Sequence, residues 1–286
     1  MTLDEQRCVG GGIWFTGAMA QLLVVADSHL SPAAPYADEH WSAIVDDVER
    51  RRPDLVVHAG DISMNGANDP ADLHHARQRL NELPVPWRAI PGNHDIGDIG
   101  DTTEAIDERR RAAYQHAFGP ASWDLRLDGW HLVGVDIQTL ASSLPTAAPL
   151  WTWLDDTVTG RERTVLFIHR PLMPLQPGDR DEPKRYVPGA CRHRLLNMID
   201  RAGVQLVVSG HVHQWRDLIH GRCRHVWTPS TWSSLPDHIQ PTIGTKVTGA
   251  VDIELGATAT VRMVRPAGVA DITGDVDFAS PYGRHR

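Results

Sequence analysis

The stretch LLVVADSH, residues 22–29, joins a run of apolar residues to an Asp-Ser-His sequence. An apolar run of this length predicts a strand buried on both faces, as in a sheet covered by helices. Further strand-length runs follow along the chain, several of them apolar at successive positions. The predicted strands are 22–26, 55–59, 87–90, 132–135, 165–168 and 206–208.

The segments between these runs carry apolar residues at helical spacing. In residues 40–51, for example, Trp41, Ile44 and Val48 fall on one face of a helix. The alternation of strands and helices predicts an α/β fold. The predicted helices are 40–51, 70–82, 103–117, 149–158 and 190–202.

After residue 210 the pattern changes to short β-prone segments separated by turn residues, which predicts a second, antiparallel sheet. These segments are 215–219, 223–228, 246–254 and 258–264. The segment 171–189 is rich in proline and charge, and predicts an excursion over the surface. We therefore predict one folded domain over 19–268, a flexible extension at 1–18 and a loosely packed tail at 269–286.

Side chains that can bind metals follow five of the predicted strands. Because the carboxyl ends of parallel strands line one edge of a sheet, these side chains could converge there. A single Asp after a strand is more often a helix cap or a turn residue, and a single His is more often a hydrogen-bonded interior residue. Their repetition makes coincidence the weaker explanation. The strand ends are Asp27-Ser28-His29, Gly60-Asp61, Gly92-Asn93-His94-Asp95, His169 and Gly210-His211-Val212-His213.

Composition and charge narrow the classes of partner. The 286 residues are 41% hydrophobic and carry a formal net charge of -8, so polymeric nucleic acid and an anionic membrane surface are not expected partners. No run approaches the roughly 20 apolar residues of a membrane-spanning helix. Cys8, Cys191 and Cys223 are widely spaced and odd in number, which argues against a disulfide framework. Because the acidic start also makes a poor signal peptide, we predict a cytoplasmic protein.

The remaining histidines lack the spacing of metal ligands. His58 lies inside a predicted strand and is interpreted as a hydrogen-bonded interior residue. Residues 108–111 are interpreted as a solvated helix face. The histidines interpreted as surface or structural residues are His74, His75, His116, His193, His220, His225 and His238.

The five strand ends, in this order, resemble the signature of the calcineurin-like metallophosphoesterase family over residues 22–213. The resemblance implies an α/β fold in which two mixed β-sheets pack as a sandwich flanked by helices. It also implies that the 19–268 domain is catalytic and binds two metal ions, with Asp61 as the bridge. One ion would be bound by Asp27, His29, Asp61 and His213, and the other by Asp61, Asn93, His169 and His211.

The resemblance also implies a mechanism. Oxygen and imidazole ligands together suit Fe, Mn or Zn better than Ca or Mg. A metal-bridging hydroxide would attack phosphorus in line, and His94, placed beside the metals, would protonate or stabilise the leaving oxygen. Asn93 and His94 would also contact the substrate. Asp95 is interpreted either as a residue that orients His94 or as a structural turn residue.

Asn93 is unusual, because a tight metal site would more often use a carboxylate at this position. Two divalent ions, the carboxylates of Asp27 and Asp61 and a bridging hydroxide leave the inner shell with a net positive charge. An Asp at 93 would cancel this charge and weaken the attraction for an anionic phosphate ester. A neutral amide ligand is therefore interpreted as a feature that favours phosphate binding.

Two features of the sequence bear on which phosphate ester is the substrate. The segment Thr228-Pro229-Ser230-Thr231 and the compact length resemble the bacterial branch that contains cyclic-nucleotide phosphodiesterases and glycerophosphodiesterases. Two residues depart from that branch. Arg170 stands where a second His is common, and either binds a phosphate oxygen or pairs with an acid of the 171–189 segment. Asn65 is interpreted as a partial replacement for an acidic residue after Asp61.

We therefore expect a dinuclear-metal phosphodiesterase that acts on small phosphodiesters, with 3′,5′-cyclic nucleotides such as cAMP as the expected substrates. The alternative is a phosphomonoesterase or nucleotide pyrophosphatase that uses the same site. A third alternative is a non-catalytic interaction module that kept the fold. Such a module is expected to have lost metal ligands, and none of the expected ligands is missing from this sequence. The acidic balance disfavours a nuclease, and a fold of this size is compatible with a homodimer.

Overall fold

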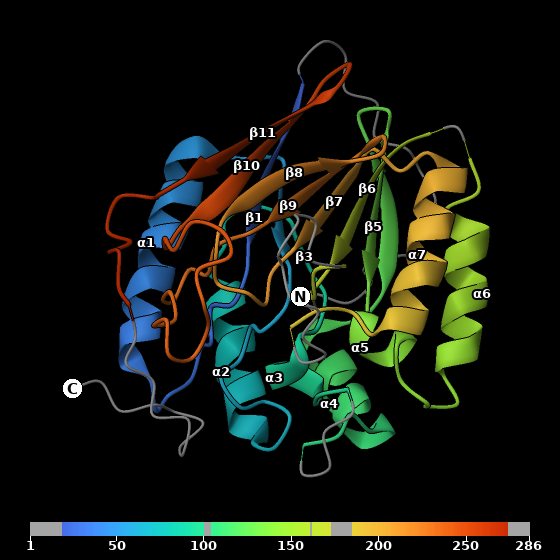
Figure 1. The fold of residues 1–286 in the computed structure, drawn as a ribbon. Coiled ribbons are helices and arrows are strands. Elements are labelled where there is room, and N and C mark those ends of the chain that lie inside the picture. Colours follow the sequence, from blue (N-terminus) through green and yellow to red (C-terminus); the bar gives the residue numbers. More distant parts are fainter. Residues whose placement is uncertain (1–18, 100–103, 161, 173–184, 274–286) are drawn as a thin grey trace, which may run out of the picture.

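The computed structural model describes residues 19–99, 104–160, 162–172 and 185–273, whose strands form two mixed β-sheets (Figure 1). The strands β1, β2 and β3 of the first sheet run parallel, so their carboxyl ends lie at one edge. The strand β10 lies antiparallel to β1. The order in this sheet is β11 (Ala259–Val264), β10 (Ala250–Leu255), β1 (Ala20–Val25), β2 (Leu55–His58) and β3 (Trp87–Ala89).

The second sheet has a parallel centre and antiparallel edges. Its order is β4 (Trp123–Leu127), β5 (Trp130–Val135), β6 (Arg163–Ile168), β7 (Leu206–Ser209), β9 (Cys223–Trp227) and β8 (Arg216–His220). The strands β5, β6, β7 and β9 run parallel, whereas β4 and β8 are antiparallel to their neighbours. The carboxyl ends of β6 and β7 therefore also lie at a common edge.

Helices flank both sheets, with α1 on one side of the molecule and α6 and α7 on the other (Figure 1). The helix α2 begins with Pro70 after Asp69, whose side chain accepts a hydrogen bond from the Ala71 amide, a typical start signal. The helices are α1 (Pro35–Arg51), α2 (Pro70–Leu80), α3 (Asn93–Ile96), α4 (Glu108–Phe118), α5 (Ile137–Leu140), α6 (Ala147–Thr157) and α7 (Gly189–Ala202).

Most of the buried apolar residues lie in a central core between the sheets or in two outer cores beneath the helices, because successive side chains of a strand point to opposite faces. Leu22 of β1 and Phe167 of β6 lie in the core between the sheets. Leu23 of β1 and Ile44 of α1 lie in the core beneath the helix. Each of these side chains is buried, and burial of one such side chain contributes roughly 1.5–3 kcal/mol. The predicted sandwich of two mixed sheets flanked by helices is confirmed.

The predicted separate antiparallel sheet after residue 210 is wrong. The strands β8 and β9 extend the second sheet beyond β7, whereas β10 and β11 extend the first sheet beyond β1. β-propensity indicates that a segment is a strand but not which strand it pairs with, since pairing depends on contacts between distant parts of the chain. The strand β4 and the short helices α3 and α5 were not predicted.

Several predicted segments lie outside the described residues, namely 1–18, the part of the excursion at 173–184, and the tail from 274. The first residues of the predicted tail pack on the domain. Val269 is buried in the core beneath α1, and the Ile272 carbonyl accepts a 2.9 Å hydrogen bond from the Ser234 amide. Among the residues that are described, none of the helices is both long and apolar enough to cross a membrane.

Candidate metal centre

The predicted ligands converge from both sheets. Asp27, Asp61 and Asn93 follow β1, β2 and β3 of the first sheet. His169 follows β6 of the second sheet, and His211 follows β7. The side chains form two groups, which we call the first ligand group (Asp27, His29, His213) and the second ligand group (Asp61, Asn93, His169, His211).

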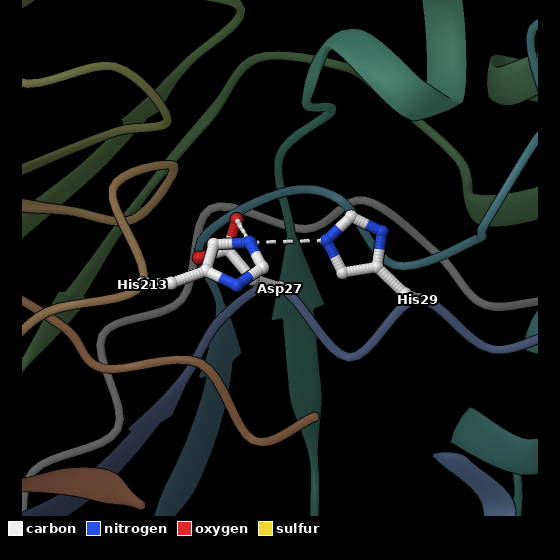
Figure 2. Close-up of side chains that lie close together, drawn as sticks. All are labelled: Asp27, His29 and His213. Carbon is white, nitrogen blue, oxygen red and sulfur yellow. Dashed lines mark hydrogen bonds and ion pairs between the residues drawn. The ribbon is translucent and has the colours of Figure 1, made fainter. Parts of the chain in front are cut away.

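The three side chains of the first ligand group lie close together (Figure 2), and all three are buried. The Nε2 atoms of His29 and His213 lie 3.2 Å apart. His213 Nε2 is also 3.5 Å from Asp27 Oδ1. One ligand atom from each of the three residues lies within 4.8 Å of the others, a spacing that one metal ion could span.

The second ligand group is centred on His169. Its Nε2 lies 3.2 Å from Asp61 Oδ2 and 3.3 Å from Asn93 Oδ1. His211 completes the group within the same 4.8 Å limit. Asp61 also lies within this limit of His29 and His94, so its carboxylate stands between the two groups.

Backbone carbonyls fix the orientation of two of these imidazoles. His169 Nδ1 donates to the Ala59 carbonyl at 2.9 Å, and His213 Nδ1 donates to the Ser233 carbonyl at 2.7 Å. Each ring therefore turns its Nε2 lone pair toward carboxylate, amide or imidazole acceptors, an arrangement that favours a cation between them. Mixed imidazole and oxygen donors fit Fe, Mn or Zn.

The electrostatics of the site also favour positive charge. Burial alone would lower the pKa of His169, but the charge of Asp61 and the hydrogen bond to it raise the pKa to about 9. The pKa of His213 is raised as well, because Asp27 outweighs the opposing effect of burial. The pKa of His29 lies well below its usual value, owing to burial and to the neighbouring His94, so this ring keeps a lone pair for a metal.

The backbone adopts a left-handed conformation at most of the predicted ligands. This region is sparsely populated by residues other than glycine, and such strain clusters at functional sites. Among the described residues, the only other non-glycine positions with positive φ are Arg52 and Asp128. The ligands concerned are Asp27 (φ 51°), His29 (48°), Asp61 (52°), His211 (72°) and His213 (50°).

Gly60 shows why a glycine precedes Asp61. Its φ is +97°, and a Cβ atom at this position would lie 2.4 Å from His169 Nδ1. That imidazole nitrogen is the one that donates to the Ala59 carbonyl. The absence of a side chain at Gly60 therefore lets a ligand from the second sheet approach the backbone of the first.

His94 and Asp95 have different surroundings. His94 Nδ1 donates to the Met64 carbonyl at 2.7 Å, and its amide donates to Asp61 Oδ1 at 2.8 Å. The Asp95 carboxylate accepts hydrogen bonds from the amides of Ile62, Ser63 and Gly92 and from the Ser63 hydroxyl, at 2.6–3.1 Å. Of the two roles left open for Asp95, these contacts support the structural one, because Met64 orients the His94 ring.

Arg170 and Asn65 lie in tightly bonded surroundings. Arg170 is fully buried and forms an ion pair with Asp98. The two roles considered from the sequence were binding of a phosphate oxygen and pairing with an acid of the 171–189 segment, and the acids of that segment, at 179, 181 and 182, lie outside the described residues. The Asn65 amide donates to Asp72 Oδ2 at 2.9 Å, and Asn65 Oδ1 accepts from Asn68 at 3.0 Å, which places this residue in a turn.

His58 is an interior residue, in agreement with the sequence interpretation. Its Nε2 shares a 2.8 Å hydrogen bond with the Ser28 hydroxyl, and burial lowers its pKa to about 3. His58 is therefore a neutral ring whose hydrogen bond to Ser28 supports the Asp27-Ser28-His29 loop. The contacts that the sequence did not reveal are the backbone acceptors Ala59, Met64 and Ser233, since a carbonyl leaves no signature in the residue type.

A model of the calcineurin-like phosphoesterase family matches residues 20–215. The chain belongs to this family. The resemblance seen in the sequence is confirmed, and the buried His and Asp clusters are consistent with the dimetal site of calcineurin-like phosphoesterases.

Curated relatives of this family member include phosphodiesterases. Glycerophosphodiester phosphodiesterase GpdQ of Enterobacter lignolyticus is 30% identical over 198 residues, which cover 65% of this chain and 66% of that protein. A 3′,5′-cyclic-nucleotide phosphodiesterase of Nostoc sp. is 24% identical over 202 residues, which cover 68% of this chain and 69% of that protein. The match to GpdQ thus falls just short of two thirds of its length.

A solved structure extends the comparison to the fold. The dimetal phosphatase of Danio rerio superposes with a TM-score of 0.64 at 13% identity, covering 87% of this chain and 98% of that one. At this identity the likeness shows the fold alone. It agrees with the two-sheet sandwich described above.

Proposed function

We propose that this family member hydrolyses small phosphodiesters at a centre of two metal ions. The observation that carries the proposal is the position of Asp61. Its carboxylate lies within ligand distance both of His29 and His94 and of His169 and His211. A carboxylate in this position could serve as a ligand to both ions of a two-metal centre.

The ligand set suits an anionic substrate. When bound, two ions of iron, manganese or zinc supply Lewis acidity and a nucleophilic oxygen at neutral pH. Only Asp27 and Asp61 bring negative charge to the two groups, since Asn93 is neutral. The centre therefore keeps a net positive charge for the phosphate oxygens.

The exposure of the residues indicates the side from which the ester approaches. Asp27, His169 and His213 are buried, whereas Asn93, His94 and His211 are half-buried. A phosphate placed over the half-buried side would meet Asn93 and His94. The Met64 carbonyl holds Nδ1 of His94, so the other ring nitrogen can give a proton to the leaving oxygen when the ring is protonated.

The names of the relatives support the substrate class. One acts on glycerophosphodiesters and the other on 3′,5′-cyclic nucleotides, and both substrates are small diesters. We propose 3′,5′-cyclic nucleotides as the first substrates to test and glycerophosphodiesters as the second. A phosphomonoesterase or nucleotide pyrophosphatase that uses the same ligands is the alternative. The cytoplasmic location and the homodimer stay predictions.

Parallel assays test the proposal. The chain is loaded with Mn²⁺, Fe²⁺ or Zn²⁺ and supplied with bis-p-nitrophenyl phosphate, p-nitrophenyl phosphate, cyclic nucleotides and a glycerophosphodiester. We expect a higher kcat/KM for the diesters than for the monoester. A preference for p-nitrophenyl phosphate would favour the monoesterase, and no hydrolysis by folded, metal-loaded protein would favour a non-catalytic module.

A further inference from the structure

Residues 228–234, between β9 and β10, contact every member of the first ligand group. We call this stretch the support segment. All of its residues are buried, although it has no regular secondary structure. Burial of an irregular segment requires partners for its backbone groups, so its hydrogen bonds are informative.

The support segment holds the strained backbone at Asp27. The Ser230 hydroxyl donates to the Asp27 carbonyl at 2.7 Å, and the Thr231 amide donates to the Ala26 carbonyl at 3.0 Å. The carbonyls on both sides of the Asp27 Cα are thereby fixed. The same Ser230 oxygen accepts from the amides of Trp232 and Ser233, at 2.9 and 3.1 Å. One hydroxyl thus ties the conformation of the segment to that of a ligand.

The next two residues of the segment contact the imidazoles. The Ser233 carbonyl accepts from His213 Nδ1 at 2.7 Å, which leaves Nε2 facing Asp27 and His29. The Trp232 ring packs against His29 with centroids 4.9 Å apart and against His213 at 5.8 Å. A rigid aromatic ring packed against both imidazoles restricts the rotation of both.

The support segment is itself anchored at several points. The Thr228 amide donates to the Ser209 carbonyl at 2.6 Å, and the Ser230 carbonyl accepts from Gly249 at 3.0 Å. His40 of α1 shares a 2.8 Å hydrogen bond with the Thr231 carbonyl. The second ligand group is hydrogen-bonded to other parts of the chain. His169 donates to the Ala59 carbonyl, and Asp61 accepts from the His94 amide.

We infer that the support segment positions the ion held by the first ligand group, with Ser230 and Trp232 as positioning residues. The inference rests on the two-metal centre proposed above. Outer partners that orient metal ligands typically contribute about 10- to 100-fold to metal affinity. Loss of Ser230 or Trp232 should therefore weaken binding at the first group by about this factor, with a smaller effect at the second.

The test is calorimetric titration of chelator-treated protein with Mn²⁺, combined with counting of bound ions after dialysis. Ser230→Ala and Trp232→Leu are compared with wild type and with Trp232→Phe, which keeps an aromatic ring. Trp130→Leu is the matched control, because Trp130 is also buried but lies at the amino end of β5, where its indole donates to the Gly256 carbonyl. Circular dichroism of the metal-free proteins verifies folding.

Two further backgrounds identify the affected group. With Asn93→Ala, which weakens the second group, Trp232→Leu should remove the remaining ion. With Asp27→Ala, which weakens the first group, Trp232→Leu should add little. If Trp232→Leu lowers metal binding equally in both backgrounds, or if Ser230→Ala and Trp232→Leu still bind two ions tightly, the role of the support segment is overturned. These outcomes leave the two-metal centre itself intact. A wild-type chain that binds fewer than two ions would overturn the dinuclear centre, and this inference with it.

Discussion

A Cβ atom at Gly92 would lie 2.1 Å from Asp61 Oδ1 and 2.3 Å from the Asp61 amide nitrogen. The turn after β3 therefore lies directly on the carboxylate that stands between the two ligand groups. Any side chain at this position requires either the turn or Asp61 to move.

Gly92→Ala should accordingly displace Asp61 and weaken both metals. Overpacking of this kind typically costs about 1–3 kcal/mol of folding free energy. Metal content after dialysis and urea unfolding measure the two effects. Gly189→Ala is the control, because a Cβ there would meet only the Arg192 guanidinium at 3.8 Å. Normal metal content in Gly92→Ala would show that the contact with Asp61 is unimportant.

Asn93→Asp tests the charge of the centre. Asn93 Oδ1 lies 3.3 Å from His169 Nε2, so a carboxylate there would still reach the second ligand group. The added negative charge should weaken inhibition by inorganic phosphate while both metals stay bound. Asn197→Asp on α7 makes the same change in charge away from the ligands. Undiminished phosphate affinity in Asn93→Asp with both metals bound would refute the charge argument.

The variant His94→Ala distinguishes two roles of His94, general acid and metal ligand. A ring nitrogen of His94 lies within 4.8 Å of ligand atoms of His29 and Asp61, so the position is compatible with either role. We expect normal metal content and a kcat lower by about 10²-fold or more, since general acid catalysis contributes about that much. The loss should be larger for diesters with alkoxide leaving groups than for p-nitrophenyl esters, which need less protonation. An empty site in this variant would make His94 a ligand.

His225 predicts a pH dependence of folding stability. Burial and the neighbouring His220 lower its pKa to about 4, and its Nε2 has no hydrogen-bond partner among the described residues. The unfolded chain, with an ordinary histidine pKa near 6.5, therefore binds more protons between about pH 6.5 and 4. Stability should fall as the pH decreases through this window, by roughly 2 kcal/mol between pH 7.5 and 5.

His225→Asn should remove this contribution to the slope. Urea unfolding of metal-free protein at the two pH values measures it, and His74→Asn, at an exposed position on α2, serves as control. A variant that keeps the full wild-type slope would show that His225 does not titrate in this way.

The sequence predicted the elements of the fold better than their pairing. Continuous apolar runs such as 22–26 indicate strands buried on both faces, and all six predicted strands are present, although Arg88 of β3 is exposed. The placement of β8 and β10 in different sheets depends on contacts with β9 and β1, which a local pattern does not encode. The short β4 was missed because two of its residues, Asp124 and Arg126, are exposed polar residues at an edge.

The candidate site was predicted from residue types but not from its geometry. The strand ends identified Asp27, Asp61 and His169, and the family resemblance divided the ligands between two ions. The positive φ angles and the Ser233 carbonyl that orients His213 could not be read, because both are properties of the backbone. Residues 173–184 of the predicted excursion, which hold the acids considered as one alternative for Arg170, lie outside the described residues.

The most direct test of the two-metal centre is the number of ions bound by wild type and by Asp61→Ala. Asp61→Asn is measured beside it, because an amide keeps an acceptor for the His94 amide while removing the bridging charge. Elemental analysis after dialysis should give two ions per wild-type chain and a loss of both from Asp61→Ala, with no hydrolysis of any ester. Two ions retained by Asp61→Ala, or fewer than two in the wild type, would contradict the bridging role of Asp61.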